Sequence, residues 1–216
     1  MIRALVFDLD GTLVDSLPGI AASVNRTMEE MGLAPHSRSA VRGFVGDGLA
    51  MLARRALGGG APDDLLARFI EVFRRDYAST WAEGTTAYPG IAEALERLAA
   101  GGAPMAVWSN KPHHFTEETV ARLFPGFGFA AVIGEREGVP RKPDPASALE
   151  IVAKLGRAAG ETAMVGDSTV DIESGRNAGF ATIAVTWGYH DRDRLAEAAP
   201  GRWIERPGDL PGLLSV

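Results

Sequence analysis

The residues of this chain that could carry out chemistry follow short apolar segments. Four of them are acidic: Asp8, Asp10, Asp167 and, one helical turn later, Asp171. Ser109 and Asn110 follow another apolar segment, and Lys142 lies in an Arg-Lys-Pro loop. Phosphoryl transfer needs one carboxylate as nucleophile, a second to handle the proton of the leaving group, and cations or N–H and O–H donors for the phosphate oxygens. These residue types favour phosphoryl-transfer chemistry.

Crowded carboxylates need a compensating cation, because like charges at close range disfavour ionisation in a partly buried cleft. Carboxylate and carbonyl oxygens suit Mg²⁺, which also shares phosphate oxygens of a substrate. The spacing around Gly11 does not fit a calcium EF-hand loop, which places its glycine at position six and a glutamate at position twelve. A Walker phosphate loop is excluded because the chain has no Gly-Lys pair. We therefore expect Mg²⁺ as the cofactor.

The elements that must position these residues alternate between strands and helices. Short apolar segments predict buried strands near residues 3–7, 105–108, 130–133, 162–165 and 182–185. Helical patterns follow at 91–99, after Pro112, at 146–155 and near 170–178. Repeated strand–helix units of this length predict an α/β fold, a Rossmann-like parallel sheet with helices on both faces. The carboxyl ends of such strands form the ligand-binding edge, where the candidate residues lie.

A block of helical patterns interrupts the chain after the first strand. Apolar residues at helical spacing occur around residues 20–31, 49–56 and 66–77, separated by glycine and proline turn signals. We expect residues 15–82 to form a small all-helical cap domain inserted into an α/β core domain of residues 1–14 and 83–216. The block has eight basic and eight acidic residues, so the net charge of −6 belongs to the core.

Four motifs in this order resemble those of the haloacid dehalogenase-like hydrolase superfamily. The first is Asp8-Leu9-Asp10-Gly11-Thr12, the second Ser109-Asn110, the third Lys142, and the fourth Gly166-Asp167-Ser168 with Asp171. The resemblance covers essentially the whole chain, and the helical block resembles the small cap of that family. A turn at Asp10-Gly11 or a helix cap at Asp167-Ser168 would explain either motif alone, but not four acidic positions together with Lys142.

The resemblance implies a role for each of these residues. Asp8 would be the nucleophile that forms an aspartyl-phosphate, and Asp10 the general acid and then the general base. Mg²⁺ would be bound by Asp8, the backbone carbonyl of Asp10 and Asp167, and by Asp171 either directly or through water. Ser109, the Asn110 amide and Lys142 would bind the substrate phosphate.

A glycine-rich segment of the cap is a weaker candidate for substrate recognition. Gly43-Phe44-Val45-Gly46-Asp47-Gly48 joins two helical patterns, and its glycines permit close approach of the backbone to a ligand. It resembles the specificity loop of capped family members, and Arg42 beside it could meet a substrate carboxylate. Flexible glycines that only join two helices remain the alternative. His190, after the last predicted strand, is a further weak candidate.

The choice among family activities depends on a few residues. Asp10 argues against haloalkanoate dehalogenases, which lack this second aspartate, and the absence of lysine from the cap excludes a phosphonoacetaldehyde hydrolase. The Lys111-Pro112 and Gly188-Tyr189 pairs most resemble phosphoglycolate phosphatases. We therefore predict a Mg²⁺-dependent phosphatase for a small phosphate monoester such as 2-phosphoglycolate. The alternatives are a pyrophosphatase, a sugar-phosphate phosphatase, a β-phosphoglucomutase-type phosphotransferase and a non-catalytic phosphate-binding module.

Composition and charge exclude several other classes of protein. A net charge of −6 and a pI near 5.3 disfavour nucleic acid as a partner. The absence of cysteine excludes disulfides and thiolate zinc sites. No apolar segment approaches a membrane span, and Asp8 and Asp10 interrupt the apolar N-terminus, so we expect neither a membrane anchor nor a signal peptide. We expect a cytoplasmic enzyme, either monomeric or homodimeric.

Overall fold

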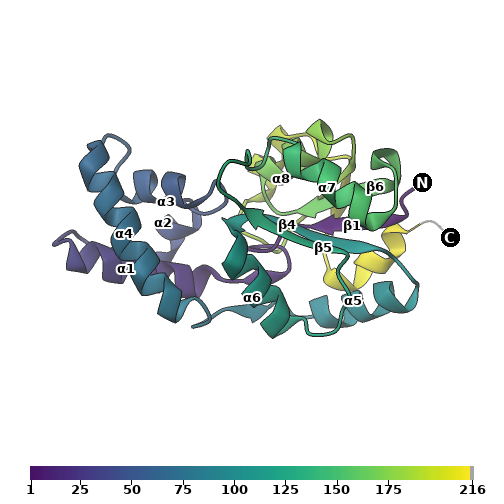
Figure 1. Ribbon diagram of the computed structural model, residues 1–216, viewed down its shortest axis with the longest axis horizontal. Helices are drawn as coiled ribbons and strands as arrows, with labels where there is room; N and C mark the ends of the chain where they lie inside the picture. The colour runs from purple at the N-terminus through teal and green to yellow at the C-terminus, as the bar shows by residue number, and fades with distance from the viewer. Residues whose placement is uncertain (215–216) are drawn as a thin grey trace. The chain divides into compact units, whose positions relative to one another are not determined.

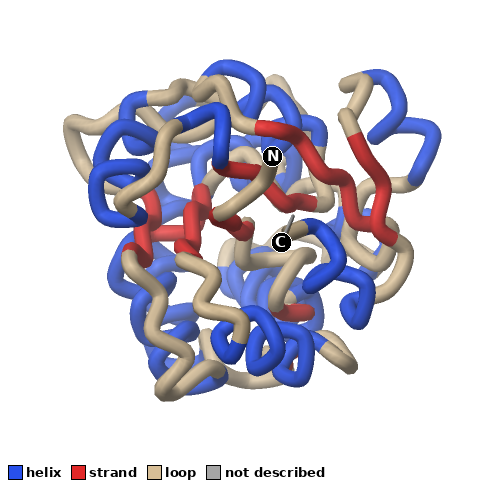
Figure 2. Tube along the Cα trace, turned by 90° about the vertical axis from the view of Figure 1, so that its right-hand side faces the viewer, coloured by secondary structure: helices blue, strands red, loops and turns tan. Residues whose placement is uncertain are grey.

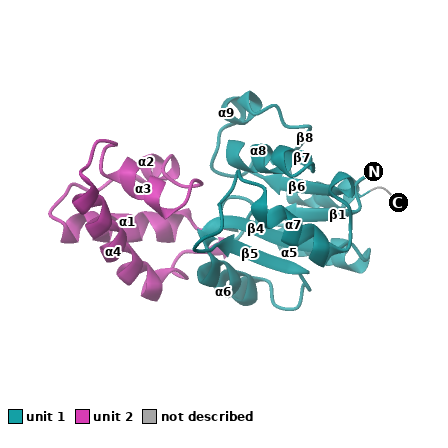
Figure 3. Cartoon of the chain, turned by 45° about the horizontal axis from the view of Figure 1, so that its top comes forward, with its two compact units in different colours: residues 1–14, 87–216 teal, residues 15–86 magenta. Residues whose placement is uncertain are grey.

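The computed structural model describes residues 1–214, which fold into two compact units (Figure 3). Unit 1 combines residues 1–14 with the described part of residues 87–216, and unit 2 comprises residues 15–86. The short strands β2 (Val14–Asp15) and β3 (Thr86–Ala87) pair where the chain passes from one unit to the other. None of the helices within the described residues is long and apolar enough to cross a membrane.

Unit 1 is built on a six-stranded sheet with the strand order β5-β4-β1-β6-β7-β8 (Figure 1). Its strands are β1 (Ala4–Phe7), β4 (Met105–Pro112), β5 (Ala131–Glu135), β6 (Thr162–Gly166), β7 (Ala181–Val185) and β8 (Arg202–Ile204). Every neighbouring pair is parallel. The predicted α/β class and its parallel sheet are therefore confirmed, whereas the sixth strand, β8, was not predicted.

Helices cover both faces of this sheet (Figures 1 and 2). They are α5 (Ile91–Ala100), α6 (His113–Leu123), α7 (Ala146–Leu155), α8 (Thr169–Asn177), α9 (Arg192–Glu197), and the 3-10 helices η1 (Ala159–Glu161) and η2 (Pro207–Leu213). Alternate residues of β1 point to opposite faces. Phe7 packs in a core with Leu95 of α5, whereas Val6 packs in a second core with Ile151 of α7. The sheet is therefore buried on both sides.

Unit 2 consists of the helices α1 (Leu17–Glu30), α2 (Arg38–Arg42), α3 (Leu49–Ala56) and α4 (Asp63–Thr80). The apolar faces of α1 and α4 pack together, with Val24 and Phe69 fully buried. Beside them, Arg26 forms a two-point ion pair with Asp76, at 2.7 and 2.9 Å. The short helix α2 was not predicted, because its five residues are too few to show a helical period.

Strand register positions the candidate residues at one edge of unit 1. Phe7, the last residue of β1, lies beside Val107 of β4 and Val165 of β6. The residues that follow these three positions therefore emerge side by side at the carboxyl edge of the sheet. The Asp8 amide continues the ladder by donating to the Val165 carbonyl at 2.9 Å.

Candidate active site

Lys142 lies at the centre of the candidate site. Its ammonium group contacts Asp8 Oδ1 at 2.8 Å, Asp171 Oδ1 at 2.6 Å and the Trp108 carbonyl at 2.9 Å. Lys142 is only 3% exposed. Burial opposes its positive charge, but the carboxylates of Asp171 and Asp8 outweigh this and raise the pKa of Lys142 above its ordinary value. The raised pKa favours a positively charged Lys142 between two acidic residues.

Asp167 and Asp171 are each held by hydrogen-bond donors. The Thr12 hydroxyl donates to Asp167 Oδ1 at 2.8 Å, and the Tyr189 amide donates to Asp167 Oδ2 at 2.7 Å. Asp171 Oδ2 accepts from the Ser168 amide at 3.0 Å and from the Ser168 hydroxyl at 2.7 Å, at the N-terminus of α8. Both side chains are about 1% exposed. These hydrogen bonds fix the orientations of both carboxylates.

Burial makes this acidic cluster energetically costly without a cation. Burial, reinforced by the charge of Asp171, raises the pKa of Asp8 to about 7 although Lys142 opposes the shift. Burial and the charges of Asp171 and Asp8 likewise raise the pKa of Asp167 well above its ordinary range. A proton or a bound cation can compensate such a cluster.

The donor set fits a hard divalent cation. Carboxylate oxygens of Asp8, Asp167 and Asp171 lie within 4.8 Å of one another. Three carboxylates and the single ammonium group of Lys142 leave two uncompensated negative charges, which equals the charge of one divalent ion. Oxygen-only ligands of this kind suit Mg²⁺. The three aspartates can therefore hold a metal ion.

Ser109 and Asn110 lie at the end of β4 and are buried. The Asn110 side chain bonds both the amide and the carbonyl of Lys142, so it orients the residue at the centre of the site. The Ser109 hydroxyl accepts a hydrogen bond from the Lys111 amide at 3.2 Å. The structure therefore brings Asn110 into contact with Lys142, and Ser109 precedes Asn110 at the end of β4.

Asp10 is paired with a lysine that the sequence analysis did not include among the site residues. The Lys111 ammonium lies 3.2 Å from Asp10 Oδ1 and 3.3 Å from Oδ2. The charge of Asp10 contributes to the raised pKa of Asp8, so the two carboxyl groups are neighbours in space. A signal was present in the sequence: Lys111 is one of three lysines in the chain and directly follows the second motif.

The glycine-rich segment of residues 43–48 lies in unit 2, between α2 and α3. Its Asp47 pairs with Arg55 of α3, which also donates to the Phe44 carbonyl at 3.0 Å. Gly46 and Gly48 have positive φ angles of 118° and 78°, which favour glycine. Arg42 is the last residue of α2 and is partly exposed.

His190 lies in unit 1, next to the residue whose amide holds Asp167. It is 7% exposed, and its Nδ1 accepts a hydrogen bond from the amide of Thr169, the first residue of α8, at 3.3 Å. This contact anchors the turn after β7 to the helix that carries Asp171. His190 therefore helps to hold the backbone around Asp167 and Asp171 in place.

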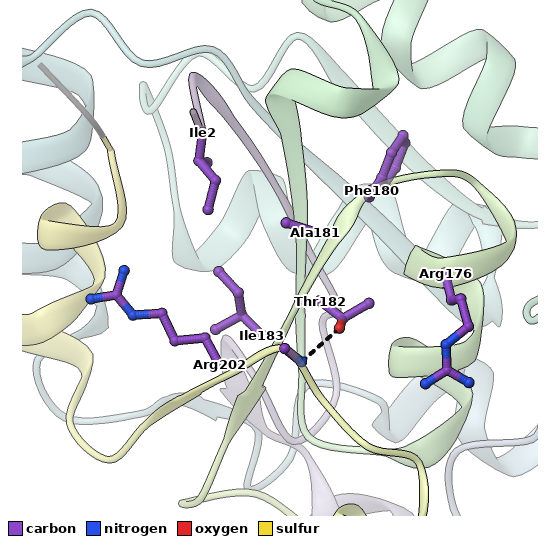
Figure 4. Close-up of a pocket in the computed structure, with 8 residues that line it drawn as sticks. Ile2, Arg176, Phe180, Ala181, Thr182, Ile183 and Arg202 are labelled. Carbon is purple, nitrogen blue, oxygen red and sulfur yellow. Dashed lines mark hydrogen bonds between the residues drawn. The ribbon is translucent and has the colours of Figure 1, made fainter.

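A separate hollow of about 410 Å³ lies near the amino ends of β7 and β8 (Figure 4). Ile2 and Phe180 contribute apolar surface to it. Its two arginines, Arg176 and Arg202, point to different sides, so they do not converge on a common point (Figure 4). Ligand sites combine a concave surface with converging polar groups. Polar groups of this converging kind are found instead in the acidic cluster at the carboxyl edge of the sheet.

Comparisons with known proteins place the chain in a family. Residues 5–185 match the sequence profile described as "Haloacid dehalogenase-like hydrolase". A phosphoglycolate phosphatase of Pseudomonas savastanoi is 36% identical over 99% of this chain and 80% of its own length. A phosphoglycolate phosphatase of Pectobacterium atrosepticum is 35% identical over 99% of this chain and 92% of its own.

Solved structures agree with the sequence comparison. The crystal structure of a protein from Lactobacillus delbrueckii subsp. bulgaricus matches with a TM-score of 0.92 and 29% identity, covering 98% of this chain and 97% of the other. A predicted phosphoglycolate phosphatase from Haemophilus somnus matches with a TM-score of 0.89 and 28% identity over the same shares. The motif order, the parallel sheet and these relatives agree, and the chain belongs to the haloacid dehalogenase-like hydrolase family.

Proposed function

We propose that this hydrolase is a Mg²⁺-dependent phosphatase that cleaves 2-phosphoglycolate through a phosphorylated Asp8. The observation that carries the proposal is the buried ammonium group of Lys142 between Asp8 and Asp171. It places a fixed cation next to a carboxylate at the edge of the sheet where substrates bind. The names of the relatives at 35–36% identity support 2-phosphoglycolate as the substrate.

Asp8, Asp167 and Asp171, with the backbone carbonyl of Asp10, are the proposed ligands of Mg²⁺. When bound, the ion supplies positive charge that stabilises the transferring phosphoryl group. Lys142 supplies a second positive charge, and Ser109 and the Asn110 amide supply hydrogen bonds for the phosphate oxygens. Positioning and electrostatic stabilisation of this kind provide most of the catalysis in phosphoryl transfer.

The chemistry proceeds in two half-reactions. Asp8 attacks phosphorus, the bond from phosphorus to the leaving oxygen breaks, and the carboxyl group of Asp10 gives its proton to that oxygen. A water molecule then attacks the phosphorus of the aspartyl-phosphate while Asp10 takes a proton from it, which releases inorganic phosphate and restores both aspartates. General acid–base catalysis of this kind contributes about 10²- to 10⁴-fold.

Unit 2, residues 15–86, is the proposed substrate-selecting cap, which the sequence predicted as residues 15–82. Its segment of residues 43–48 would contact the substrate, and Arg42 would meet the carboxylate that distinguishes 2-phosphoglycolate from simple alkyl phosphates. Arg55 pairs with Asp47 and donates to the Phe44 carbonyl, and these contacts favour a single conformation of the segment. His190 completes the proposed specificity residues.

Phosphate release from a panel of esters tests the proposed function. The panel contains 2-phosphoglycolate, pyrophosphate, hexose phosphates and nucleotides, each with Mg²⁺ and with EDTA. We expect the highest kcat/KM for 2-phosphoglycolate, loss of turnover in EDTA, and a transient acid-stable phosphate label that Asp8→Asn abolishes. Lys154→Gln, on the exposed face of α7, is the control that should behave like the unmodified enzyme.

Each alternative predicts a different result in the same panel. If the enzyme prefers pyrophosphate or a hexose phosphate, then 2-phosphoglycolate is not its substrate, but the mechanism through a phosphorylated Asp8 still holds. Isomerisation of a hexose phosphate without phosphate release would indicate a phosphotransferase, and binding without turnover a non-catalytic module. The cytoplasmic location stays a prediction, which fractionation of the source cells would test.

A further inference from the structure

Lys111 and Asp10 form a second buried ion pair beside the one made by Lys142. The ammonium nitrogen of Lys111 lies 3.2 and 3.3 Å from the two carboxylate oxygens of Asp10, so it bridges them almost symmetrically. The side chain of Lys111 is 4% exposed and that of Asp10 is 12% exposed. A lysine buried to this extent requires a partner, because an isolated buried charge is costly.

Lys111 lies in an irregular stretch of β4. The register of β4 with β5 shifts between Trp108 and Pro112, and irregularities of this kind re-aim side chains near active sites. The backbone of Lys111 is fixed on both sides. Its amide donates to the Ser109 hydroxyl at 3.2 Å, and its carbonyl accepts from the Thr116 hydroxyl at 3.1 Å. Lys111 is therefore held in place by groups other than Asp10.

We propose that Lys111 is a positioning residue for Asp10, which holds the Asp10 carboxyl group where it exchanges a proton with the leaving oxygen and then with water. The inference rests on the proposed function, since it assigns Asp10 the role of general acid and base. Lys111 would act through Asp10 and need not touch the phosphoryl group, for which Lys142 is already placed.

The two half-reactions explain why the cation is useful there. After Asp10 has given its proton to the leaving oxygen, it is a carboxylate for as long as Asp8 carries the phosphoryl group. During that interval Asp10 is an anion next to other acidic groups, and the Lys111 ammonium is the hydrogen-bonded cation that stabilises it. The proton returns when water attacks, so Asp10 is again a neutral acid beside the Lys111 ammonium and can serve the next substrate.

The dependence of rate on the leaving group separates this role from a structural one. An alkoxide leaving group needs the proton of Asp10, whereas p-nitrophenolate is a weak base and leaves without it. Ethyl phosphate is an alkyl ester without the carboxylate of 2-phosphoglycolate. Measuring kcat/KM for these three esters, with Lys111→Gln, Lys111→Arg and the surface control Lys154→Gln, reports the step that forms the phosphorylated Asp8.

We expect Lys111→Gln to lower kcat/KM for both alkyl esters about tenfold more than for p-nitrophenyl phosphate, as part of the general-acid contribution. Lys111→Arg should recover part of the loss, because it restores a cation, and Lys154→Gln should change nothing. The thermal midpoint of each variant is recorded. If Lys111→Gln unfolds, the kcat/KM values of Lys111→Arg for the three esters are compared with those of the unmodified enzyme instead.

Other outcomes overturn the inference in distinguishable ways. An equal fall for all three esters would assign Lys111 to phosphate binding or to general stability. A fall confined to 2-phosphoglycolate would assign it to the substrate carboxylate. If the unmodified enzyme hydrolyses alkyl phosphates but not 2-phosphoglycolate, only the proposed substrate is wrong. If it hydrolyses no ester, the proposed function fails and the role of Lys111 fails with it.

Discussion

The side chain of Asn110 bonds the backbone of Lys142 on both sides of the residue. Its Nδ2 donates to the Lys142 carbonyl at 3.1 Å, and its Oδ1 accepts from the Lys142 amide at 2.9 Å. The two residues are 32 positions apart in the sequence and both are buried. The end of β4 is thereby tied to the loop that carries the central ammonium group. The backbone position of Lys142 is thus held by one amide side chain, while Asp8, Asp171 and the Trp108 carbonyl hold its ammonium group.

Replacing Asn110 by alanine should therefore impair the enzyme through Lys142. The variant leaves two buried backbone groups without their partner, which costs about 1–3 kcal/mol each. We expect a lower thermal midpoint and a fall in kcat of about tenfold or more, since 1.4 kcal/mol corresponds to a factor of ten. Asn177→Ala is the matched control, because it removes a similar bond of 2.9 Å to the neighbouring Pro143 carbonyl at an exposed position. Equal kcat in both variants would contradict the positioning role.

Metal binding should become tighter as the pH rises towards neutrality. Burial raises the pKa of Asp8 from its ordinary 3.8 to about 7, so the metal-free site holds a proton below pH 7 that Mg²⁺ must displace. The apparent affinity for Mg²⁺, measured by calorimetry between pH 5.5 and pH 8.5, should rise at least about tenfold per pH unit below pH 7, because the pKa of Asp167 is raised as well. A flat profile over this range would contradict the raised pKa.

The same shift predicts how the stability of the metal-free protein changes with pH. The folded state binds the Asp8 proton up to about pH 7, whereas the unfolded chain releases it near 3.8. Between these values the folded state holds more protons, so the Asp8 contribution to the free energy of unfolding falls as the pH rises. Thermal melts without Mg²⁺ should therefore show Asp8→Asn gaining stability over the unmodified protein between pH 5 and pH 8. If Asp8→Asn instead lost stability relative to the unmodified protein as the pH rises, the ionised Asp8 carboxylate would stabilise the folded state.

Much of the scaffold was predictable because its signals are local. The apolar segment before Asp8 predicted a strand buried on both faces, and β1 is fully buried at the centre of the sheet. The helix predicted at 146–155 is α7 with the same bounds. The order of motifs at strand ends then placed Asp8, Asp167 and Asp171 at one edge, where their oxygens lie within 4.8 Å.

The contacts that orient the site were not predictable in the same way. β4 continues to Pro112, beyond the predicted end at residue 108, with a register shift that no periodicity reveals. Lys111 lies within that irregular stretch of β4. The bonds of Asn110 to Lys142 depend on a loop 32 residues away. The edge strand β8 has only three residues, too few for an alternating pattern.

Gly188 should tolerate no side chain, because it lies against Asp167. A Cβ atom built at Gly188 would overlap the Asp167 carboxylate, whose place is already fixed by Thr12 and Tyr189. Gly188→Ala should therefore displace Asp167 and weaken Mg²⁺ binding about 10- to 100-fold, the range found when groups behind metal ligands are changed. The matched control is Gly160→Ala, where the added methyl group meets open space. Unchanged Mg²⁺ affinity in Gly188→Ala, measured by calorimetry, would remove Asp167 from the proposed ligands.

Arg55 should control the affinity for substrate without contributing to the chemical step. It pairs with Asp47 and donates to the Phe44 carbonyl at 3.0 Å, so it fixes a segment whose Gly46 and Gly48 would otherwise allow many conformations. If this segment contacts the substrate as proposed, Arg55→Ala should raise KM for 2-phosphoglycolate several-fold and leave kcat within about twofold. The reason is that the segment would then become ordered only when substrate binds, which reduces the free energy of binding.

Arg75→Ala separates this effect from a general loss of charge in unit 2. Arg75 is 62% exposed and pairs with Glu30 at the surface, where such pairs contribute little to stability. We expect this variant to keep the KM of the unmodified enzyme. If Arg55→Ala lowers the thermal midpoint but leaves KM unchanged, the ion pair with Asp47 is structural and the segment of residues 43–48 does not select the substrate. If both variants raise KM equally, the net charge of the helical unit matters rather than the conformation of that segment.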